Sequence, residues 1–371
     1  MAQTLEPALG HASEGSRRSS LVTVTTSRRL AAICATIACF GLLTACGQGD
    51  QAESSSPSIT IATHDSWAMD KSVMADFTQQ TGIKVKIAKL GDAGEMTNKL
   101  ILTKSAPIAD GVFGLNNPLL VRALENGILT EADVDVPDSA YDEAKAIRTD
   151  LAAPIDFSDV CLNVDKAWFA AKGKPAPSGL ADLTRPEYRG LFVTPGADTS
   201  SPGQAFLLAT VAAEGKGWPA YWEKLMANDT KVVSGWTEAY ETDFSAGSGQ
   251  GTRPIVVSYS SSPPFTIPAG GEAPTTAALL DTCYRDVEYA GALQGSEKSA
   301  EVEEFVQFML GRKFQQQLPE QMYVYPIDSA IKLPAAWAKW APTAVDPLVL
   351  TEDELGDTPE LVKAWREIVT R

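Results

Sequence analysis

The stretch ADGVFGLNNPLLVRALENG, residues 109–127, joins a strand to a helix and predicts the fold class. Its first seven residues form a short apolar run that is typical of a buried strand. We expect Asn117 to cap the following helix, with Pro118 at the first helical position and Gly127 closing it. Strands that are apolar throughout and lead into helices are typical of parallel sheets covered on both faces, so the stretch predicts an α/β fold.

The residues before this stretch repeat the same alternation. Residues 58–63 (SITIAT) and 83–90 (IKVKIAKL) alternate as strands do. Helices are expected from Asp70 to Gly82 and over residues 95–104 (EMTNKLILTK). The order is therefore β-α-β-α-β-α, as in a mostly parallel sheet.

A second set of strands and helices follows Pro154. Strands are expected at residues 159–165, 191–194, 231–235 and 254–260. Helices are expected at residues 200–215 with Ser201 as cap, 218–228, 237–247, 301–310, and 358–370 with Thr358 as cap. Two such sets predict two α/β lobes. Ligands of open α/β sheets bind at the carboxyl ends of strands, so the site is expected in the cleft between the lobes.

Composition and charge restrict the class of partner. The chain has 371 residues, 44% of them hydrophobic and 21% charged, which suits a large two-lobed globular protein. The net charge of −16 argues against nucleic acid or an anionic membrane face as partner. A neutral or cationic ligand is favoured.

The N-terminus predicts export. Residues 1–45 have arginines followed by the apolar run 30–45, which is shorter than the roughly 20 residues of a membrane span and typical of a signal peptide. The run ends in LLTAC, a lipobox pattern, so we expect lipidation at Cys46 and a flexible tether over residues 46–57. The alternatives are an uncleaved anchor or ordinary secretion.

After cleavage, Cys161 and Cys283 are the cysteines left besides Cys46. In an extracytoplasmic protein they are disulfide candidates, and the alternative is two buried thiols. His64 is the one histidine of the mature chain, so no metal site is expected.

Three loops that follow predicted strands contain candidate binding residues. In THDSW, residues 63–67, His64 is either a structural residue or a ligand contact. In LGDAGEM, Asp92 either caps the next helix or accepts hydrogen bonds from an amino group. In ADTSSPG, Ser200 and Ser201 stand at a helix start, whose free N–H groups favour an anion or hydroxyl.

The fourth loop, IVVSYSSSPPF at residues 255–265, is joined by SGWTEAY at residues 234–240. Trp236, Tyr259 and Phe265 offer aromatic faces, each of which attracts a cation by roughly 0.5–2 kcal/mol. The loop adds small hydroxyl groups and rigid prolines, Ser260, Ser261, Ser262, Pro263 and Pro264. A flat cationic ring held between aromatic side chains is therefore predicted.

Several of these stretches resemble the thiamine-binding proteins of bacterial ABC importers in order and spacing. They are ADGVFGLNNPLL, DTSSPG, VSGWTEAY, VVSYSSSPPF and KFQQQLPEQMYVYPI. The resemblance runs from about Ile59 to Arg371. The order of strands and helices alone, without these motifs, would fit any type II periplasmic binding protein. It implies two lobes, residues 58–159 plus 286–371 and residues 160–285, joined by crossover hinges near 155–160 and 287–292. Cys161 and Cys283 would then lie beside the hinge.

The resemblance also implies a ligand set. The positions carried over are Asp92, Ala93, Ser200, Ser201, Trp236, Tyr259, Ser260, Ser261, Ser262 and Pro263, with further aromatic groups at Phe265 and Tyr323. His64 stands where the family has a tyrosine, and an extra small residue shifts the loop around Ala93. The implied function is capture of thiamine, or its mono- or pyrophosphate, by a monomeric exported lipoprotein at the outer face of the cytoplasmic membrane or in the periplasm. The protein would hand the vitamin to an ABC permease, without catalysis or a cofactor.

Other functions fit these residues less well. A serine hydrolase would need a general base and a G-x-S-x-G elbow, but the mature chain offers one histidine and no such elbow. A ferric-iron site of the related binding proteins uses adjacent tyrosines, but Ser260 follows Tyr259 here. A polyamine or another cationic solute remains the alternative. Polyamine sites favour several carboxylates, of which these loops offer Asp65 and Asp92.

Overall fold

The computed structural model describes residues 57–371, except 142–146, 148 and 249–250. The predicted signal peptide, the lipidation at Cys46 and nearly all of the tether lie outside the described residues. Within the described ranges, no helix has both the length and the apolar character that crossing a bilayer requires.

The first lobe begins with the predicted β-α-β-α-β-α order. Its elements are β1 (Ser58–Thr63), α1 (Lys71–Thr81), β2 (Lys84–Lys89), α2 (Ala93–Leu102), β3 (Gly111–Leu115) and α3 (Asn117–Glu125). Strand β1 pairs in parallel with β2 and β3. All five residues of β3 are buried, as the apolar run predicted.

The elements that follow form the second lobe together with β4 (Ala153–Asp165) and β8 (Thr276–Ala292), the strands that lead into it and out of it. Between these two strands lie α4 (Lys166–Lys172), β5 (Phe192–Pro195), α5 (Ser201–Glu214), α6 (Trp218–Ala227), β6 (Lys231–Val233), a π-helical turn (Glu238–Asp243) and β7 (Ile255–Tyr259). Short 3-10 turns lie at Leu180–Thr184, Pro186–Tyr188, Gly215–Gly217 and Pro263–Thr266. Strand β5 pairs in parallel with β6 and β7.

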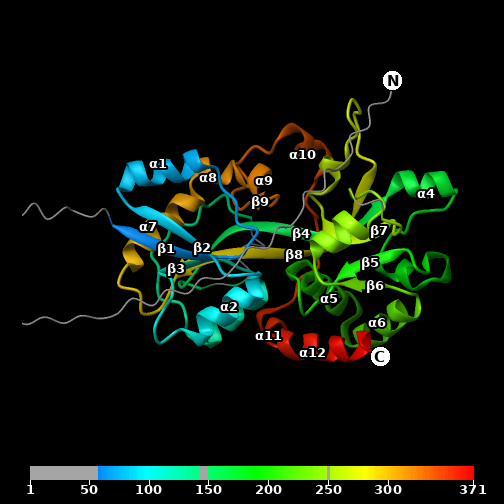
Figure 1. The fold of residues 1–371 in the computed structure, drawn as a ribbon, viewed down its shortest axis with the longest axis horizontal. Coiled ribbons are helices and arrows are strands. Elements are labelled where there is room, and N and C mark those ends of the chain that lie inside the picture. The colour runs from blue at the N-terminus through cyan, green and yellow to red at the C-terminus, as the bar shows by residue number, and fades with distance from the viewer. Residues whose placement is uncertain (1–56, 142–146, 148, 249–250) are drawn as a thin grey trace, which may run out of the picture. The chain divides into compact units, whose positions relative to one another are not determined.

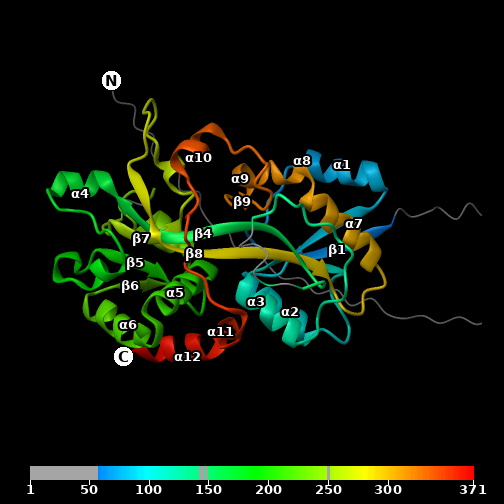
Figure 2. The ribbon, with the colours of Figure 1, turned by 180° about the vertical axis from the view of Figure 1, so that it is seen from behind.

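Two long antiparallel strands, β4 and β8, connect the lobes. The sheet order is β2-β1-β3-β8-β4-β7-β5-β6, with β9 (Tyr325–Pro326) paired to β4. Figures 1 and 2 show β4 and β8 running from the half with β1 to β3 into the half with β5 to β7. The predicted hinge segments 155–160 and 287–292 lie inside these strands. The two-lobed mixed α/β fold is confirmed, and the lobes share one continuous sheet.

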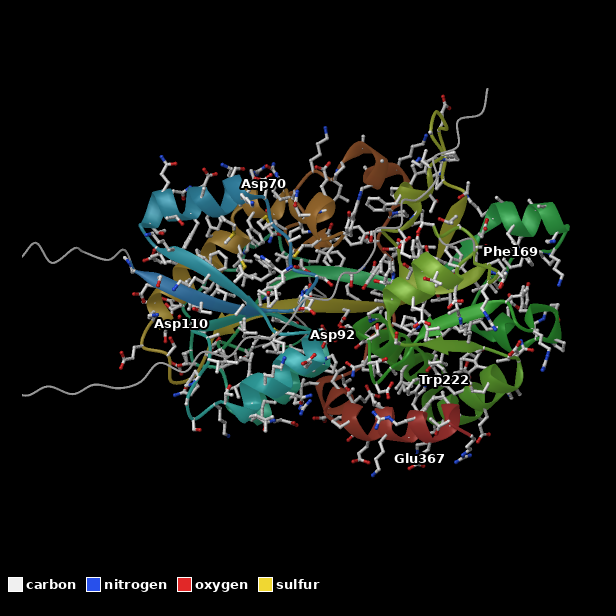
Figure 3. All side chains as sticks on the ribbon, viewed as in Figure 1. Asp70, Asp92, Asp110, Phe169, Trp222 and Glu367 are labelled. Carbon is white, nitrogen blue, oxygen red and sulfur yellow. A yellow bond between two sulfur atoms is a disulfide. The ribbon has the colours of Figure 1, made fainter. Side chains whose placement is uncertain are left out.

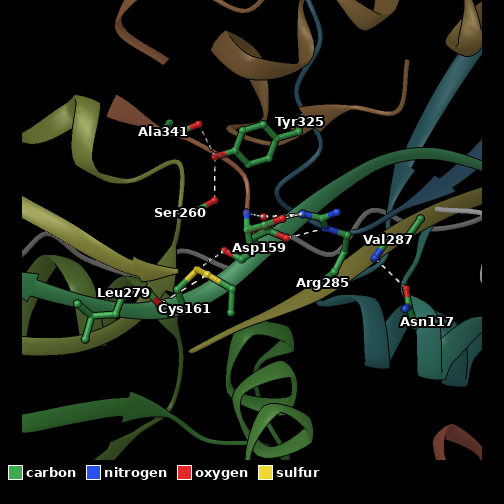
Figure 4. Close-up of polar contacts among 11 residues, drawn as sticks. Asn117, Asp159, Cys161, Ser260, Leu279, Arg285, Val287, Tyr325 and Ala341 are labelled. Atoms are coloured by element: carbon green, nitrogen blue, oxygen red, sulfur yellow. Dashed lines mark hydrogen bonds and ion pairs between the residues drawn. A yellow bond between two sulfur atoms is a disulfide. The ribbon is translucent and has the colours of Figure 1, made fainter. Parts of the chain in front are cut away.

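The connecting strands are linked by polar and covalent contacts (Figure 4). The guanidinium of Arg285 on β8 donates to both carboxylate oxygens of Asp159 on β4, at 2.8 and 2.9 Å. Cys161 and Cys283 form a disulfide between the same strands, with their Cα atoms 4.1 Å apart. These contacts hold β4 and β8 together where the lobes meet.

The last part of the chain contains α7 (Ser299–Leu310), α8 (Arg312–Gln315), α9 (Leu318–Gln321), α10 (Ala335–Trp340), α11 (Glu352–Gly356) and α12 (Thr358–Val369). Helix α11 packs on α3, whereas α12 packs on α5 and α6. The rings of Trp365 and Trp222 meet edge to face at 5.5 Å, and Arg366 pairs with Asp198 at 2.9 Å. The prediction that residues 286–371 belong to the first lobe is therefore wrong for α12. Trp365 and Ile368 of its apolar stripe are buried, and Leu361 and Val362 are partly buried.

Three predicted caps are displaced by one residue. Asn116, not Asn117, caps α3 by accepting from Leu119 N at 3.3 Å. Ser200 and Asp357 occupy the N-cap positions predicted for Ser201 and Thr358. The Asn117 side chain instead accepts from Val287 N on β8 at 2.8 Å, so a tertiary contact uses the group expected to cap the helix.

Candidate functional site

A cavity of about 980 Å³ is lined by both lobes. The loops after β1 and β2 contribute His64, Asp65 and Asp92 from one lobe. The loops after β5, β6 and β7 contribute the facing wall from the other lobe. All five loops leave the carboxyl ends of strands, where the topology of an α/β sheet places ligands.

Most of the residues predicted from sequence line this cavity. They are His64, Asp92, Ala93, Ser200, Ser201, Trp236, Tyr259, Ser261, Ser262, Phe265 and Tyr323. Ser260 and Pro263 are not among the lining residues. Ser260 is fully buried, and its Oγ lies 2.8 Å from Tyr325 Oη on the other face of the sheet (Figure 4). The structure therefore assigns Ser260 a packing role, because alternate residues at a strand end point to opposite faces.

The aromatic wall is fixed by hydrogen bonds beneath it. Trp236 stacks on Tyr240 with ring centroids 4.9 Å apart and an interplanar angle of 13°. Its Nε1 donates to Ser258 Oγ at 2.9 Å, and Ser258 Oγ lies 2.8 Å from Ser262 Oγ. Tyr259 lies at a tilt, 6.2 Å from the indole. The predicted hydroxyl of Ser262 thus orients the indole, and the indole and phenol present faces that suit a flat ring.

The mouth of the cavity carries two exposed aromatic side chains. Phe265 is 54% exposed and Tyr323 51% exposed, and their rings meet edge to face at 4.8 Å. Tyr323 has φ of 62°, a left-handed conformation that a bulky residue rarely adopts. Ser261 Oγ donates to Tyr323 O at 3.0 Å and ties this segment to the β7 loop. Strained backbone held by neighbouring contacts is typical of binding sites.

Two helix starts face each other across the cavity. Asp92 caps α2 by accepting from Gly94 N at 3.3 Å, and Ser201 Oγ lies 3.4 Å from Asp92 Oδ1. Figure 3 shows Asp92 at the amino end of α2, on the side of the second lobe. Burial raises the pKa of Asp92 above its usual value. Ser200, at the start of α5, makes no side-chain capping bond to any described residue, so its hydroxyl can serve a ligand.

The floor of the cavity contains acids that the sequence analysis missed. Asp156 on β4 pairs in register with Glu288 on β8, and Ser158 pairs with Asp286. Since side chains alternate along strands, these four lie on one face of the two strands. Ser158, Asp286 and Glu288 line the cavity. The acidic spacing in IDFSD and RDVEY is the sequence signal for these acids, but it lies within the strands and not in the loops that follow them.

The floor acids have strongly different pKa values. Burial alone would lower the pKa of His64, but Glu288, 3.2 Å from its Nε2, outweighs burial and raises it. Burial would raise the pKa of Glu288, yet the nearby imidazole holds it below its usual range. Burial, reinforced by Glu288, raises the pKa of Asp286 to about 7 and that of Asp156 well above its usual range. The floor thus places His64, whose charged form is favoured by Glu288, beside two acids whose protonated forms are favoured.

Comparison with known proteins identifies the class. A family model described as bacterial extracellular solute-binding protein matches residues 72–344, so the chain belongs to this family of transport components, which are not enzymes. A thiamine-binding periplasmic protein of Salmonella typhimurium (strain LT2) is 26% identical over 320 residues, which cover 85% of this chain and 94% of the relative.

Solved structures agree in fold. A periplasmic thiamin binding protein aligns with a TM-score of 0.73 and 26% identity, over 85% of this chain and 97% of that chain. Iron-bound HitA from Pseudomonas aeruginosa aligns with a TM-score of 0.68 and 20% identity, over 84% and 99%. The second likeness shows the fold alone.

Proposed function

We propose that this protein captures thiamine, or its mono- or pyrophosphate, between its lobes and delivers it to an ABC permease. The observation that carries the proposal is that one cavity is lined both by an aromatic wall, formed by Trp236 and Tyr259, and by an acidic floor. A flat ring with a positive charge is complementary to both surfaces. The likeness to thiamine-binding relatives over most of the chain supports the same ligand.

The geometry suggests how the vitamin lies. The thiazolium ring would stack against Trp236 and Tyr259, and Asp92 would accept from the amino group of the pyrimidine. The hydroxyethyl or phosphate tail would lie at the start of α5, where Ser200 and Ser201 and the helix N-terminus offer donors. Closure of the lobes would exclude water from the rings, and thiamine would be carried as cargo without a cofactor.

Export and anchoring form part of the proposal. Residues 1–45 would be removed, Cys46 would receive lipid, and the following polar residues would tether a monomeric binding domain to the membrane. The proposal predicts that Cys46→Ser releases the protein into the soluble fraction, while the unchanged protein stays with membranes. Equal distribution of both proteins would contradict the anchor.

Isothermal titration calorimetry with thiamine and its two phosphates tests the ligand. Thiamine should bind, and Trp236→Ala should weaken binding at least tenfold because the stacked face is lost. Unchanged affinity in Trp236→Ala would remove the stacking claim.

A polyamine is the second candidate ligand. The floor carboxyl groups of Asp286 and Glu288 supply the additional acids that a polyamine site favours. Spermidine and putrescine therefore belong in the competition series. Displacement of thiamine by spermidine at equal concentration would favour the polyamine.

A further inference from the structure

The strands that join the lobes present two chemically different faces. Asp159 and Arg285 lie on one face as a buried ion pair. The opposite face carries Asp156, Asp286 and Glu288, of which the last two line the cavity, and His64 is the one basic side chain paired with them among the described residues. Three acids therefore share one partner cation, although uncompensated buried charge is costly.

Two acids of this floor have buried oxygens without a hydrogen-bond partner among the described residues, namely both oxygens of Asp156 and one oxygen of Asp286, and of these two acids Asp286 lines the cavity. Asp286 Oδ2 accepts from Asn116 Nδ2 at 3.2 Å. Its Oδ1 is buried and has no hydrogen-bond partner among the described residues, although the residue lines the cavity and is 6% exposed. A buried oxygen without a donor is rare in native proteins, and one that faces a ligand cavity points to a group supplied by the ligand.

We propose that Asp286, flanked by Asp156 and Glu288 on the cavity floor, receives the positive charge of the bound ligand, and that the incoming cation displaces a proton from this carboxyl group to the solvent. The inference rests on the proposed capture of a cationic solute. It adds a charge-selecting residue on β8 to a site otherwise formed by loops, and it makes ligand affinity depend on pH.

The groups around Asp286 determine the sign of this dependence. They are Glu288, Tyr284 and Tyr289 on its own strand, Asp156 on β4, Asn116 and the backbone N–H of Asn117 at the start of α3, and Tyr259 at the end of β7, with His64 paired to Glu288. Glu288 repels a negative charge on Asp286 and burial disfavours it, so the acid keeps its proton up to a pKa of about 7. A cation beside it reverses this preference, because opposite charges stabilise the ionised acid. Binding should thus release a proton near neutral pH and strengthen as the pH rises toward 8.

Calorimetry can count that proton. Thiamine binding is measured at pH 7 and pH 8 in phosphate and in imidazole, whose ionisation enthalpies differ, so the difference in heat gives the protons released. We expect about half a proton at pH 7, because a group with a pKa of about 7 is half protonated there, and clearly less at pH 8.

A neutral analogue, 3-deazathiamine, carries carbon in place of the charged thiazolium nitrogen. It should bind the unchanged protein without release of a proton. It should also bind Asp286→Asn and the unchanged protein about equally, which shows that the cavity of the variant is folded.

Asp286→Asn should bind thiamine at least tenfold more weakly, release almost no proton and lose the pH dependence between pH 6 and 8. Asp281→Asn is the matched control, because it removes the same charge from an exposed position of β8 outside the cavity. It should behave like the unchanged protein. Should Asp286→Asn fail to fold, the difference in proton release between thiamine and its neutral analogue decides the question.

The outcomes separate the two proposals. If Asp286→Asn binds thiamine as tightly as the unchanged protein, the role of Asp286 is overturned and thiamine capture stays intact. The same holds if proton release persists in Asp286→Asn, because the proton then comes from another group such as His64. Equal proton release on binding of thiamine and of the neutral analogue would also overturn the role of Asp286 and leave thiamine capture intact. No binding of thiamine to the unchanged protein overturns both.

Discussion

Arg285 and Asp159 form an ion pair between the two strands that join the lobes, with side chains 3% and 0% exposed. Asp159 Oδ2 also accepts from Ala344 N at 2.7 Å, and the guanidinium lies 4.6 Å from the centre of the Phe157 ring. The pair is therefore fully enclosed by β4, β8 and the C-terminal segment.

Breaking this pair should destabilise the protein strongly. Arg285→Met leaves the Asp159 carboxylate buried without its cation, which costs about 3–5 kcal/mol of unfolding free energy. Urea denaturation measures the loss. The double variant Arg285→Met with Asp159→Asn should regain most of it, because the asparagine carries no charge and still accepts from Ala344 N. A double variant as unstable as the single one would show that the cause is lost packing.

Ser258 should affect ligand affinity through Trp236. Ser258→Ala removes the acceptor for the indole Nε1, which weakens the orientation of the stacking face by about 0.5–1.5 kcal/mol, or roughly two- to tenfold in affinity for thiamine. Calorimetry gives the affinity. Ser139→Ala, a substitution of the same kind at an exposed hydrogen-bonded serine, should leave affinity unchanged. Equal effects of the two substitutions would contradict the orienting role.

The stability of the ligand-free protein should fall as pH rises from 5.5 to 7. The pKa of Asp286 is about 7 in the folded state against a model value of 3.8, so the folded state binds the proton more tightly and loses this advantage as pH rises. The raised pKa of Asp156 acts in the same direction, and so does that of His64 above its ordinary value of 6.5. A difference of one bound proton between the folded and unfolded states changes the free energy of unfolding by about 2 kcal/mol over 1.5 pH units.

Urea denaturation at pH 5.5, 6.2 and 7.0 measures this slope. The lowered pKa of Glu288 acts only below its ordinary value of 4.5 and does not enter this range. Asp286→Asn should flatten the slope, whereas Asp281→Asn should not. A stability that increases over this range would contradict the assigned protonation states.

The disulfide should stabilise the fold with little effect on the site. It closes a loop with a sequence separation of 122 between β4 and β8. Replacing both Cys161 and Cys283 by alanine should therefore cost about 2–5 kcal/mol, mainly by releasing the unfolded chain. Thermal and urea unfolding measure the cost. Thiamine affinity should change less than threefold, because neither cysteine lines the cavity. A larger loss of affinity would show that the bond shapes the site.

The elements of the fold were predictable because their patterns are local. The stripe of Val302, Phe305, Val306 and Met309 on α7 is entirely buried, as its helical spacing predicted. The caps were less predictable, since neighbouring residues such as Asn116 and Asn117 are chemically alike and tertiary contacts decide between them. Whether α12 packs on the first or the second lobe depends on which lobe has an uncovered apolar surface. The sequence of the helix alone does not encode this.

The walls of the cavity were easier to predict than its floor. Loop residues such as Trp236 and Ser201 follow strands directly, so sheet topology alone brings them together. Asp156 and Glu288 are 132 positions apart in the sequence, and their contact depends on the antiparallel register of β4 and β8. A shift of one residue in that register would place Asp156 and Glu288 on opposite faces of the sheet.

Helix α11 packs on one lobe and α12 on the other. The chain therefore crosses between the lobes at Asp357 as well, away from β4 and β8. Two adjacent strands alone would let the lobes swing and also twist about the strand direction. An attachment off that axis opposes twisting, and a swing of the lobes must bend the short junction between α11 and α12 at Gly356 and Asp357. The C-terminus would then set how wide the protein opens to admit its cargo, although it contributes no residue to the binding cavity.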